Sequence, residues 1–448
     1  MTTVPSAPTK QRARITVSHT SAAIMLICGA TLLFEGYDVY VFGVAVPSLL
    51  QDSGWQLSPE YVGVIGSAAV FGMLVGAFAA GTFTDILGRR RVYLATVATF
   101  SLGMLLCAVA PNPEFLLVSR VIVGIGSGGF LPTALSVVVE FSPAGKKNFN
   151  VALALAGIGI GGILCALLGI WMLPVFGYRS LFWIGAIPLF TLLPLIMARM
   201  PESVAFLVSK GRIDQAREQV TRFRLPVTLD EVETGSAHQE DHRGSRALDA
   251  TLALFGRAHI RATVVFWLST SLCLLLLFGT NTWLPSLMMK AGYGINSALS
   301  FLVFLNIGAV VGSLIGSAVA DRTGPKPVVL VGFAGAAVAL CALALQPPTV
   351  LVYALVLLVG AGGAGTQNLI NSYMATYYPP SSRGSGLGLA LAFGRLGGIV
   401  GPIYGGFILA SGASTATGFL AFTIPPALAI CVVAFGPRVA GRVKERLA

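Results

Sequence analysis

The sequence predicts an all-α polytopic membrane protein with twelve transmembrane helices. Apolar residues make up 55% of the 448 residues and charged residues only 10%, whereas a soluble globular protein carries about 25% charged residues. Long apolar runs recur along the chain, and a run of about 20 such residues can cross a bilayer as a helix. One long polar segment divides these runs into two groups, which predicts two six-helix halves.

The apolar runs occur in two groups of six in chain order. The first group covers residues 22–47, 61–83, 92–110, 114–139, 149–172 and 180–199, and the second covers 262–284, 297–319, 327–345, 349–375, 384–410 and 416–435. Between the groups, the start of the polar segment has an amphipathic pattern that predicts a short helix. We therefore expect an N-terminal tail (1–21), an N-terminal bundle (22–199), a central loop (200–261), a C-terminal bundle (262–435) and a C-terminal tail (436–448).

The distribution of Lys and Arg predicts the orientation of the spans. Nearly all of these residues flank one side of the predicted bundle, and only Arg179 and Lys290 lie on the other side. Positive residues mark the cytoplasmic side of membrane proteins, so we expect both termini to be cytoplasmic and the protein to lie in the cytoplasmic membrane. This topology explains the net charge of +11, and no nucleic-acid partner is expected.

An internal repeat supports the division into halves. Asp85 and Asp321 occupy similar loop sequences 236 residues apart, and the same offset aligns Gly124 with Gly360 and Lys147 with Arg383. Parallel repeats of this kind build the two halves of major facilitator transporters. With this offset, two acidic residues of the first span have no acidic counterpart, so unshared charges are the place to look for function.

The two unshared acids, Glu35 and Asp38, interrupt the first apolar run. A carboxylate inside a membrane is costly unless it is paired, protonated or beside a wet cavity, and a spacing of three places both on one helix face. We predict a proton-coupling site here, and a purely structural ion pair remains the alternative. All four histidines lie outside the predicted spans, so a carboxylate would have to carry the proton.

Two arginines are also predicted to lie inside the membrane. Arg120 lies about 10 Å inside the outer boundary of the fourth span, at a depth comparable to that of Asp38, so the two could pair or compete for one partner. Arg395 lies about 16 Å from the inner end of the eleventh span. Because a guanidinium matches a carboxylate in bidentate geometry, we predict that Arg395, and Arg120 as a second candidate, bind an anionic substrate. A structural role remains the alternative.

Polar and aromatic side chains on other spans could complete a substrate site. Gln367 and Asn371 are four residues apart and share one face of the tenth span. Tyr37 is expected to line a pocket of the size of an aromatic ring. The other aromatic candidates are Tyr40, Phe278, Trp283 and Phe393.

The segment GTFTDILGRRR, which begins at Gly81, lies in the predicted cytoplasmic turn between the second and third spans. Glycine allows close helix approach, and an aspartate can cap the following helix or pair with arginines. We predict a conformational latch that has no need to touch substrate. Its members are Gly81, Asp85, Gly88, Arg89, Arg90, Glu140 at the inner end of the fourth span, and Asp321 from the degenerate copy SAVADRTGPKP.

Other kinds of chemistry are disfavoured. The six cysteines lie in apolar runs without metal or disulfide spacing. The glycine run that follows Arg120 has the look of a dinucleotide fingerprint, but no strand precedes it, so close helix packing explains it better. No enzymatic constellation is present, and we expect no metal or cofactor, with a proton gradient as the driving force.

These motifs resemble those of a known family. GTFTDILGRRR matches the signature of the major facilitator superfamily, and FEGYDVY, the glycine run after Arg120, the PES after the sixth span and GRLGGIVGP together resemble its aromatic acid:proton symporter family. The resemblance covers nearly the whole chain outside 225–260. It implies two six-helix halves related by a pseudo-two-fold axis, proton coupling by the first-span acids, and binding or translocation of an aromatic carboxylate by Arg120 and Arg395. Glu35 stands where aspartate is usual, and DRTGPKP is an atypical second loop.

We therefore expect a secondary active transporter, not an enzyme, that imports a benzoate-class acid by proton symport through alternating access. Asp38 would carry the proton with Glu35 assisting, and the protein would work as a monomer in the bilayer. Two alternatives stay open. One is a proton-coupled symporter of another small organic acid or a sugar, and the other is a membrane sensor of the same fold that binds without transporting.

Overall fold

The protein is a multi-pass helical membrane protein. The computed structural model describes residues 19–142, 146–223, 251–257 and 259–439. Within these residues, twelve helical segments are long and apolar enough to cross a membrane, and no strand occurs. The twelve-span prediction is confirmed.

The first half contributes six spans. They are α1 (His19–Leu50), α2 (Pro59–Leu87), α3 (Arg89–Ala108), α4 (Pro113–Gly128) with α5 (Phe130–Phe141), α6 (Lys147–Phe176), and α7 (Arg179–Ala186) with η1 (Ile187–Leu189) and α8 (Leu192–Arg199). Two of these helices have clear start signals, because Ser58 and Asn112 cap helices whose first residue is proline.

The second half contributes the other six. They are α13 (Ile260–Lys290), α14 (Ile295–Thr323), α15 (Pro325–Ala344), α16 (Thr349–Gly360) with η2 (Ala361–Gly365) and α17 (Thr366–Tyr377), α18 (Arg383–Ala410) and α19 (Thr415–Ala434). The fourth and tenth spans are therefore interrupted at equivalent, glycine-rich points. In the tenth span the interruption is a π-helical turn, a feature that often marks functional sites.

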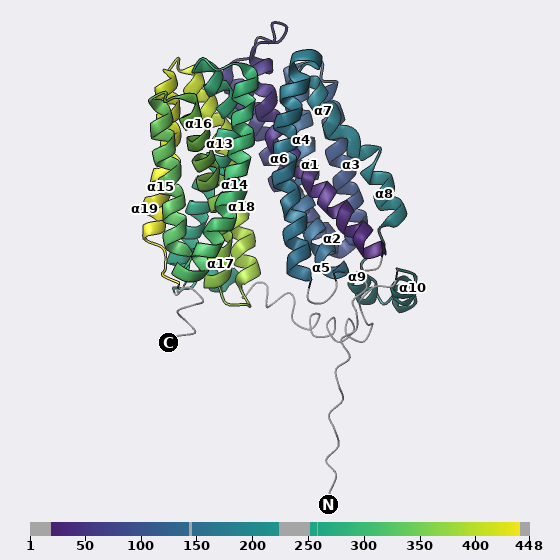
Figure 1. The fold of residues 1–448 in the computed structure, drawn as a ribbon. Helices are drawn as coiled ribbons and strands as arrows, with labels where there is room; N and C mark the ends of the chain where they lie inside the picture. The colour runs from purple at the N-terminus through teal and green to yellow at the C-terminus, as the bar shows by residue number, and fades with distance from the viewer. Residues whose placement is uncertain (1–18, 143–145, 224–250, 258, 440–448) are drawn as a thin grey trace, which may run out of the picture.

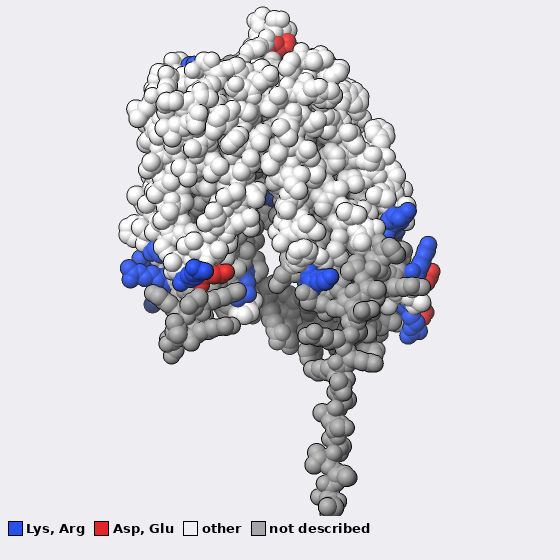
Figure 2. Space-filling view, viewed as in Figure 1, with Lys and Arg blue, Asp and Glu red and all other residues white. Residues whose placement is uncertain are grey.

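The two halves stand side by side and meet mainly at one end (Figure 1). Lys and Arg side chains gather at the opposite end, which we call the basic end, and a notch opens there between the halves (Figure 2). The halves touch through α1 and α13, α2 and α18, and α6 and α14. The tight contacts, such as Gly43 against Asn281 and Gly63 against Pro402, belong to helix segments far from the basic end.

Glycines allow the helices of each half to touch backbone to backbone. A methyl group on Gly124 would lie 2.0 Å from the carbonyl oxygen of Ala69, and one on Gly360 would lie 1.9 Å from that of Leu305. Both pairs are related by the 236-residue offset, so the same helix contact occurs in each half. The glycine run of the fourth span is thus a packing surface, as predicted, and small residues of this kind bring membrane helices together.

The first and seventh spans follow a different register from the one the sequence predicted. Gly161 packs against the carbonyl oxygen of Leu33, and its repeat partner Gly397 packs against that of Ser271. Leu33 and Ser271 are 238 residues apart, so the offset of 236 is wrong for this helix. In the corrected register Glu35 corresponds to Cys273 and Asp38 to Leu276, so the acids remain unshared between the halves.

The amphipathic region after the sixth span forms two helices instead of the single helix that was predicted. They are α9 (Val204–Ser209) and α10 (Ile213–Phe223). Gly211, with a φ of 70°, turns the chain between them, a conformation that glycine adopts without steric cost. Val204 and Leu207 of α9 are buried, so this segment docks on the basic end of the first half.

We predict that Gly124→Ala lowers the thermal stability of the detergent-solubilised protein, because the added methyl group would collide with backbone atoms of α2 that cannot rotate away. Overpacking of this kind costs roughly 1–3 kcal/mol. The measurement is the Tm from tryptophan fluorescence. Gly81→Ala is the matched control, since a methyl group at Gly81 meets nothing within 4 Å. Equal Tm values for the two variants would contradict the packing role of Gly124.

Candidate functional site

The first component of the site is a buried ion pair within the first half. Arg120 Nη1 of α4 donates to Asp38 Oδ1 of α1 across 2.7 Å. Asp38 is 0% exposed and Arg120 is 3% exposed, and the guanidinium also lies 5.2 Å from the centre of the Phe42 ring. Of the two possibilities that equal depth left open, pairing or competition for one partner, the structure shows pairing. A buried charge needs such a partner because removal from water costs several kcal/mol per ion.

The pair keeps unused hydrogen-bonding capacity. Asp38 Oδ2 and Arg120 Nε are buried and have no hydrogen-bond partner among the described residues. A cavity of about 10 Å³ adjoins them, and Phe278 and Thr282 of α13 also line it. This volume is close to the space that one water molecule needs. The ion pair of the first half is therefore in contact with the second half.

The second component joins the two halves. Glu35 of α1 and Arg395 of α18 interact electrostatically, but they do not form a direct ion pair within the described residues. Glu35 Oε2 and Arg395 Nη1 are each buried without a hydrogen-bond partner among those residues. An acid of the first half and an arginine of the second half thus lie within electrostatic range of each other, each with bonding capacity left for a polar ligand.

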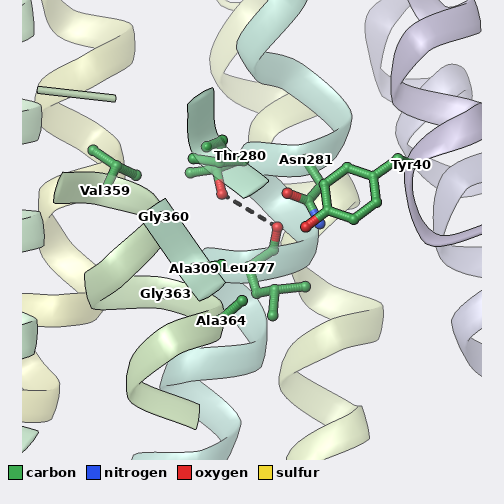
Figure 3. Close-up of a pocket in the computed structure, with 10 residues that line it drawn as sticks. Tyr40, Leu277, Thr280, Asn281, Ala309, Val359, Gly360, Gly363 and Ala364 are labelled. Carbon is green, nitrogen blue, oxygen red and sulfur yellow. Dashed lines mark hydrogen bonds between the residues drawn. The ribbon is translucent and has the colours of Figure 1, made fainter. Parts of the chain in front are cut away.

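Aromatic and amide side chains line a separate small cavity between the halves. Tyr40 of α1 lies beside Asn281 of α13 in a small cavity whose far wall is the π-helical turn η2 (Figure 3). Asn281 Nδ2 is buried without a partner among the described residues. The sequence analysis named Tyr40 but missed Asn281, although an asparagine inside an apolar span was a usable signal.

Three other predicted substrate residues are engaged within their own half. The Tyr37 hydroxyl donates to the carbonyl oxygen of Leu181 at 2.8 Å, which directs it into the first bundle. Gln367 Nε2 donates to Asn371 Oδ1 at 3.1 Å, as their spacing of four residues predicted. Each of these three side chains therefore has a hydrogen-bond partner within its own half, while Gln367 Oε1 stays buried without a partner among the described residues.

Two of the aromatic candidates also have partners inside the second half. The Trp283 indole donates to the carbonyl oxygen of Pro402 at 2.7 Å, so it joins α13 to α18. Phe393 stacks on Trp267 with ring centres 5.0 Å apart. Both rings therefore contribute to packing in this conformation, whereas Phe278 faces the Asp38 cavity.

The predicted latch lies at the basic end and connects to α9. Arg89 Nη1 and Glu140 Oε2 form an ion pair of 2.8 Å. Glu140 Oε1 accepts hydrogen bonds from Ser203 Oγ at 2.8 Å and from the Val204 amide at 2.9 Å, so Glu140 joins α3 and α5 to the start of α9. The ion pair thus joins two of the predicted latch residues.

Other latch residues differ in their surroundings. Gly88 connects α2 to α3 with a φ of 94°, which requires glycine. Gly81 is exposed with open space around it, so the expectation that it permits close helix approach is wrong in this conformation. Asp321 is also exposed. The side chain of Asp85 lies outside the described residues.

Glu202 belongs to the same network and was missed in the sequence analysis. Its Oε1 accepts from the backbone amides of Arg90 and Ser203, each at 3.0 Å, and Arg90 Nη2 donates to the carbonyl oxygen of Met197 at 2.7 Å. The available signal was an acid directly after the sixth span. Among the described residues, no three His, Cys, Asp or Glu side chains gather as metal ligands.

Comparison with known proteins identifies relatives over nearly the whole chain. The family model of the Major Facilitator Superfamily matches residues 28–312 and 302–447. The chain is 34% identical over 422 residues to a benzoate transport protein of Acinetobacter baylyi, covering 92% of this chain and 88% of that protein. It is 33% identical to a gentisate transporter of Corynebacterium glutamicum, covering 91% and 85%.

A solved structure has the same fold. The partially occluded, inward-open conformation of the xylose transporter XylE from E. coli matches with a TM-score of 0.76. The match covers 94% of this chain and 99% of XylE at 18% sequence identity.

We predict that Arg120→Met destabilises the protein by roughly 3–5 kcal/mol, because it leaves the Asp38 carboxylate buried without its partner. The double variant with Asp38→Asn should recover much of this loss, since neither charge is then buried. The measurement is a double-mutant cycle of Tm values in detergent. If the two single losses simply added in the double variant, the ion pair would not be the source of the effect.

Proposed function

Because this chain belongs to the major facilitator superfamily, we infer that it is a secondary transporter, and we propose that it imports a benzoate-class aromatic acid together with protons by alternating access. The observation that carries the proposal is the placement of two acid and arginine pairs around the interface between the halves. The Asp38 and Arg120 pair lies within one half, and the Glu35 and Arg395 pair spans both.

The orientation follows from the charges at the two ends. Positive residues mark the cytoplasmic side, so the basic end is assigned to the cytoplasm, with both termini on that side of the cell membrane. The notch in Figure 2 then opens toward the cytoplasm, which supports an inward-facing state as the one observed. Alternating access requires a second state in which the notch is closed and the opposite end is open.

Arg395 is the proposed binding group for the substrate carboxylate. It lies on the second half, it has an unused Nη1, and it faces Glu35 without direct pairing. A substrate carboxylate could take the place opposite the guanidinium in bidentate geometry. The names of the relatives, which refer to benzoate and gentisate, support an aromatic carboxylate as the substrate.

Asp38 is the proposed proton carrier. In the observed state it accepts a 2.7 Å hydrogen bond from Arg120, the arrangement expected of an ionised carboxylate. Protonation would remove the charge that holds Arg120 and would loosen the contact between α1 and α4. We therefore assign the paired state to the stage after the proton has left toward the cytoplasm. Glu35 assists by interacting with Arg395 when no substrate is bound, and the substrate carboxylate replaces it there on binding.

Proton coupling also meets the energetic requirement of anion uptake. A monovalent anion that enters a negative-inside cell works against about 2.3 kcal/mol per 100 mV. One accompanying proton makes the step electroneutral, and a second allows the membrane potential to drive it. The proposed cycle needs no cofactor and places no requirement on oligomeric state, so a monomer suffices.

We predict that Asp38→Asn abolishes accumulation of labelled benzoate against its gradient in proteoliposomes with an imposed proton gradient. Exchange of internal and external benzoate should continue, because the binding residue Arg395 is intact. Glu114→Gln is the matched control, since it removes an exposed carboxylate at the start of α4. Accumulation by Asp38→Asn at the wild-type level would refute the proton role. Absence of exchange in the wild-type protein would instead favour a sensor.

We predict that Arg395→Lys raises the KM for benzoate by about 10- to 100-fold, because a charge-assisted hydrogen bond contributes about 1.5–3 kcal/mol and an ammonium cannot make the paired contacts of a guanidinium. Initial rates of labelled benzoate uptake measure this change. Arg383→Lys, at the exposed start of the same helix, should leave KM unchanged. An unchanged KM in Arg395→Lys would exclude Arg395 as the carboxylate ligand.

A further inference from the structure

A large apolar hollow lies away from the candidate site, between α1 and α6. It has a volume of about 800 Å³ and lies at the ends of these helices that are nearest the basic end. Apart from Lys146 and Asn150, every residue that lines it is apolar or glycine. The lining residues on α1 are Ala22, Met25, Leu26, Gly29, Ala30 and Leu33. We call this hollow the α1–α6 groove.

The groove opens toward the lipid and not into the notch. Phe149, Leu153 and Ile160 line it and are 67%, 61% and 50% exposed, respectively. They continue as an exposed apolar stripe through Trp171 of the same helix. Gly162, on a different face of α6, packs against Asn306 of α14. The face of α6 that carries the groove is therefore separate from the face that meets the second half.

Two backbone contacts explain why the groove exists. Gly36 and Gly161 hold α1 and α6 in direct contact deeper in the membrane. Gly157 also contacts the Gly29 carbonyl within the groove, and beyond this contact the helices diverge toward the basic end, where the start of α1 lies near α8 (Figure 1). The separation leaves Leu26 74% exposed at the groove, so the apolar walls need an apolar occupant.

The dimensions and charge of the groove fit one kind of occupant. From Ala22 to Leu33 the α1 wall is about 16 Å long at 1.5 Å per residue, and one leaflet of a bilayer has a hydrocarbon depth of about 15 Å. Lys146 closes the groove at the basic end and is exposed. An acyl chain would lie along the walls while its phosphate meets the Lys146 ammonium at the membrane surface.

We propose that the α1–α6 groove binds an anionic phospholipid of the leaflet at the basic end, with its headgroup at Lys146 and one acyl chain against α1. The assignment is independent of the transported substrate. Since α1 carries Glu35 only two residues beyond Leu33, an occupant of the groove supports the diverged position of the helix that bears both acids.

The test measures bound lipid directly. The intact protein is equilibrated with equal amounts of phosphatidylglycerol and phosphatidylethanolamine of identical chains, and the lipids that remain bound are counted by native mass spectrometry. We expect at least a threefold preference for phosphatidylglycerol. Lys146→Gln should abolish this preference. Lys147→Gln is the matched control, because Lys147 is an equally exposed neighbour that does not line the groove.

A second variant tests the acyl chain. A side chain at Gly29 would enter open space, since a methyl group there meets nothing within 4 Å. Gly29→Phe should therefore fill the groove, keep the wild-type Tm, and reduce bound lipid at least threefold. The proposal is overturned if both lipids are retained equally, if Lys147→Gln acts like Lys146→Gln, or if Gly29→Phe retains lipid at the wild-type level. None of these readouts depends on transport.

Discussion

The organisation of this protein depends on keeping charged side chains inside an apolar bundle. Asp38 and Arg120 are almost fully buried, and each is tolerable only because the other lies 2.7 Å away. Glu35 and Arg395 belong to different halves and form no direct ion pair within the described residues. One pair therefore stays within a rigid body while the other spans two bodies that can separate. In the proposed cycle, the contact inside one half responds to the proton and the contact between the halves responds to the ligand.

The halves can act as rigid bodies because their helices touch through backbone atoms. Gly124 and Gly360 make the same contact at equivalent points of the two bundles, and an interior packed in this way resists small deformations. The halves also share one kind of hydrogen bond at the basic end, from a cationic side chain to backbone carbonyl oxygens. Arg90 donates to the carbonyl oxygen of Met197, and its repeat partner Lys326 donates to those of Ala434 and Gly436. A cation thus satisfies free carbonyls at the end of the last helix of each half.

The halves differ where acids are added to this common plan. Glu140 and Glu202 tie α9 to the basic end of the first half. The residues that the offset of 236 places opposite them in the second half are Thr376 and Arg438, so that end keeps its positive charge. The first half thus has both the intramembrane acids and the latch, whereas the second half contributes Arg395. This division suits a cycle in which proton and substrate act on opposite sides of one interface.

Hydrophobicity and charge spacing were enough to determine the number of spans and the ionisable residues within them, because a bilayer penalises every unsatisfied polar group in the same way. The pairing of Asp38 with Arg120 could be anticipated from equal depth. Depth along a helix does not specify which face a side chain occupies. Only the tertiary structure therefore shows that Tyr37 donates a hydrogen bond to Leu181 and that Arg395 lies within electrostatic range of Glu35. The 238-residue register of the first helix and the two-helix form of 204–223 likewise depend on packing contacts that no local pattern encodes.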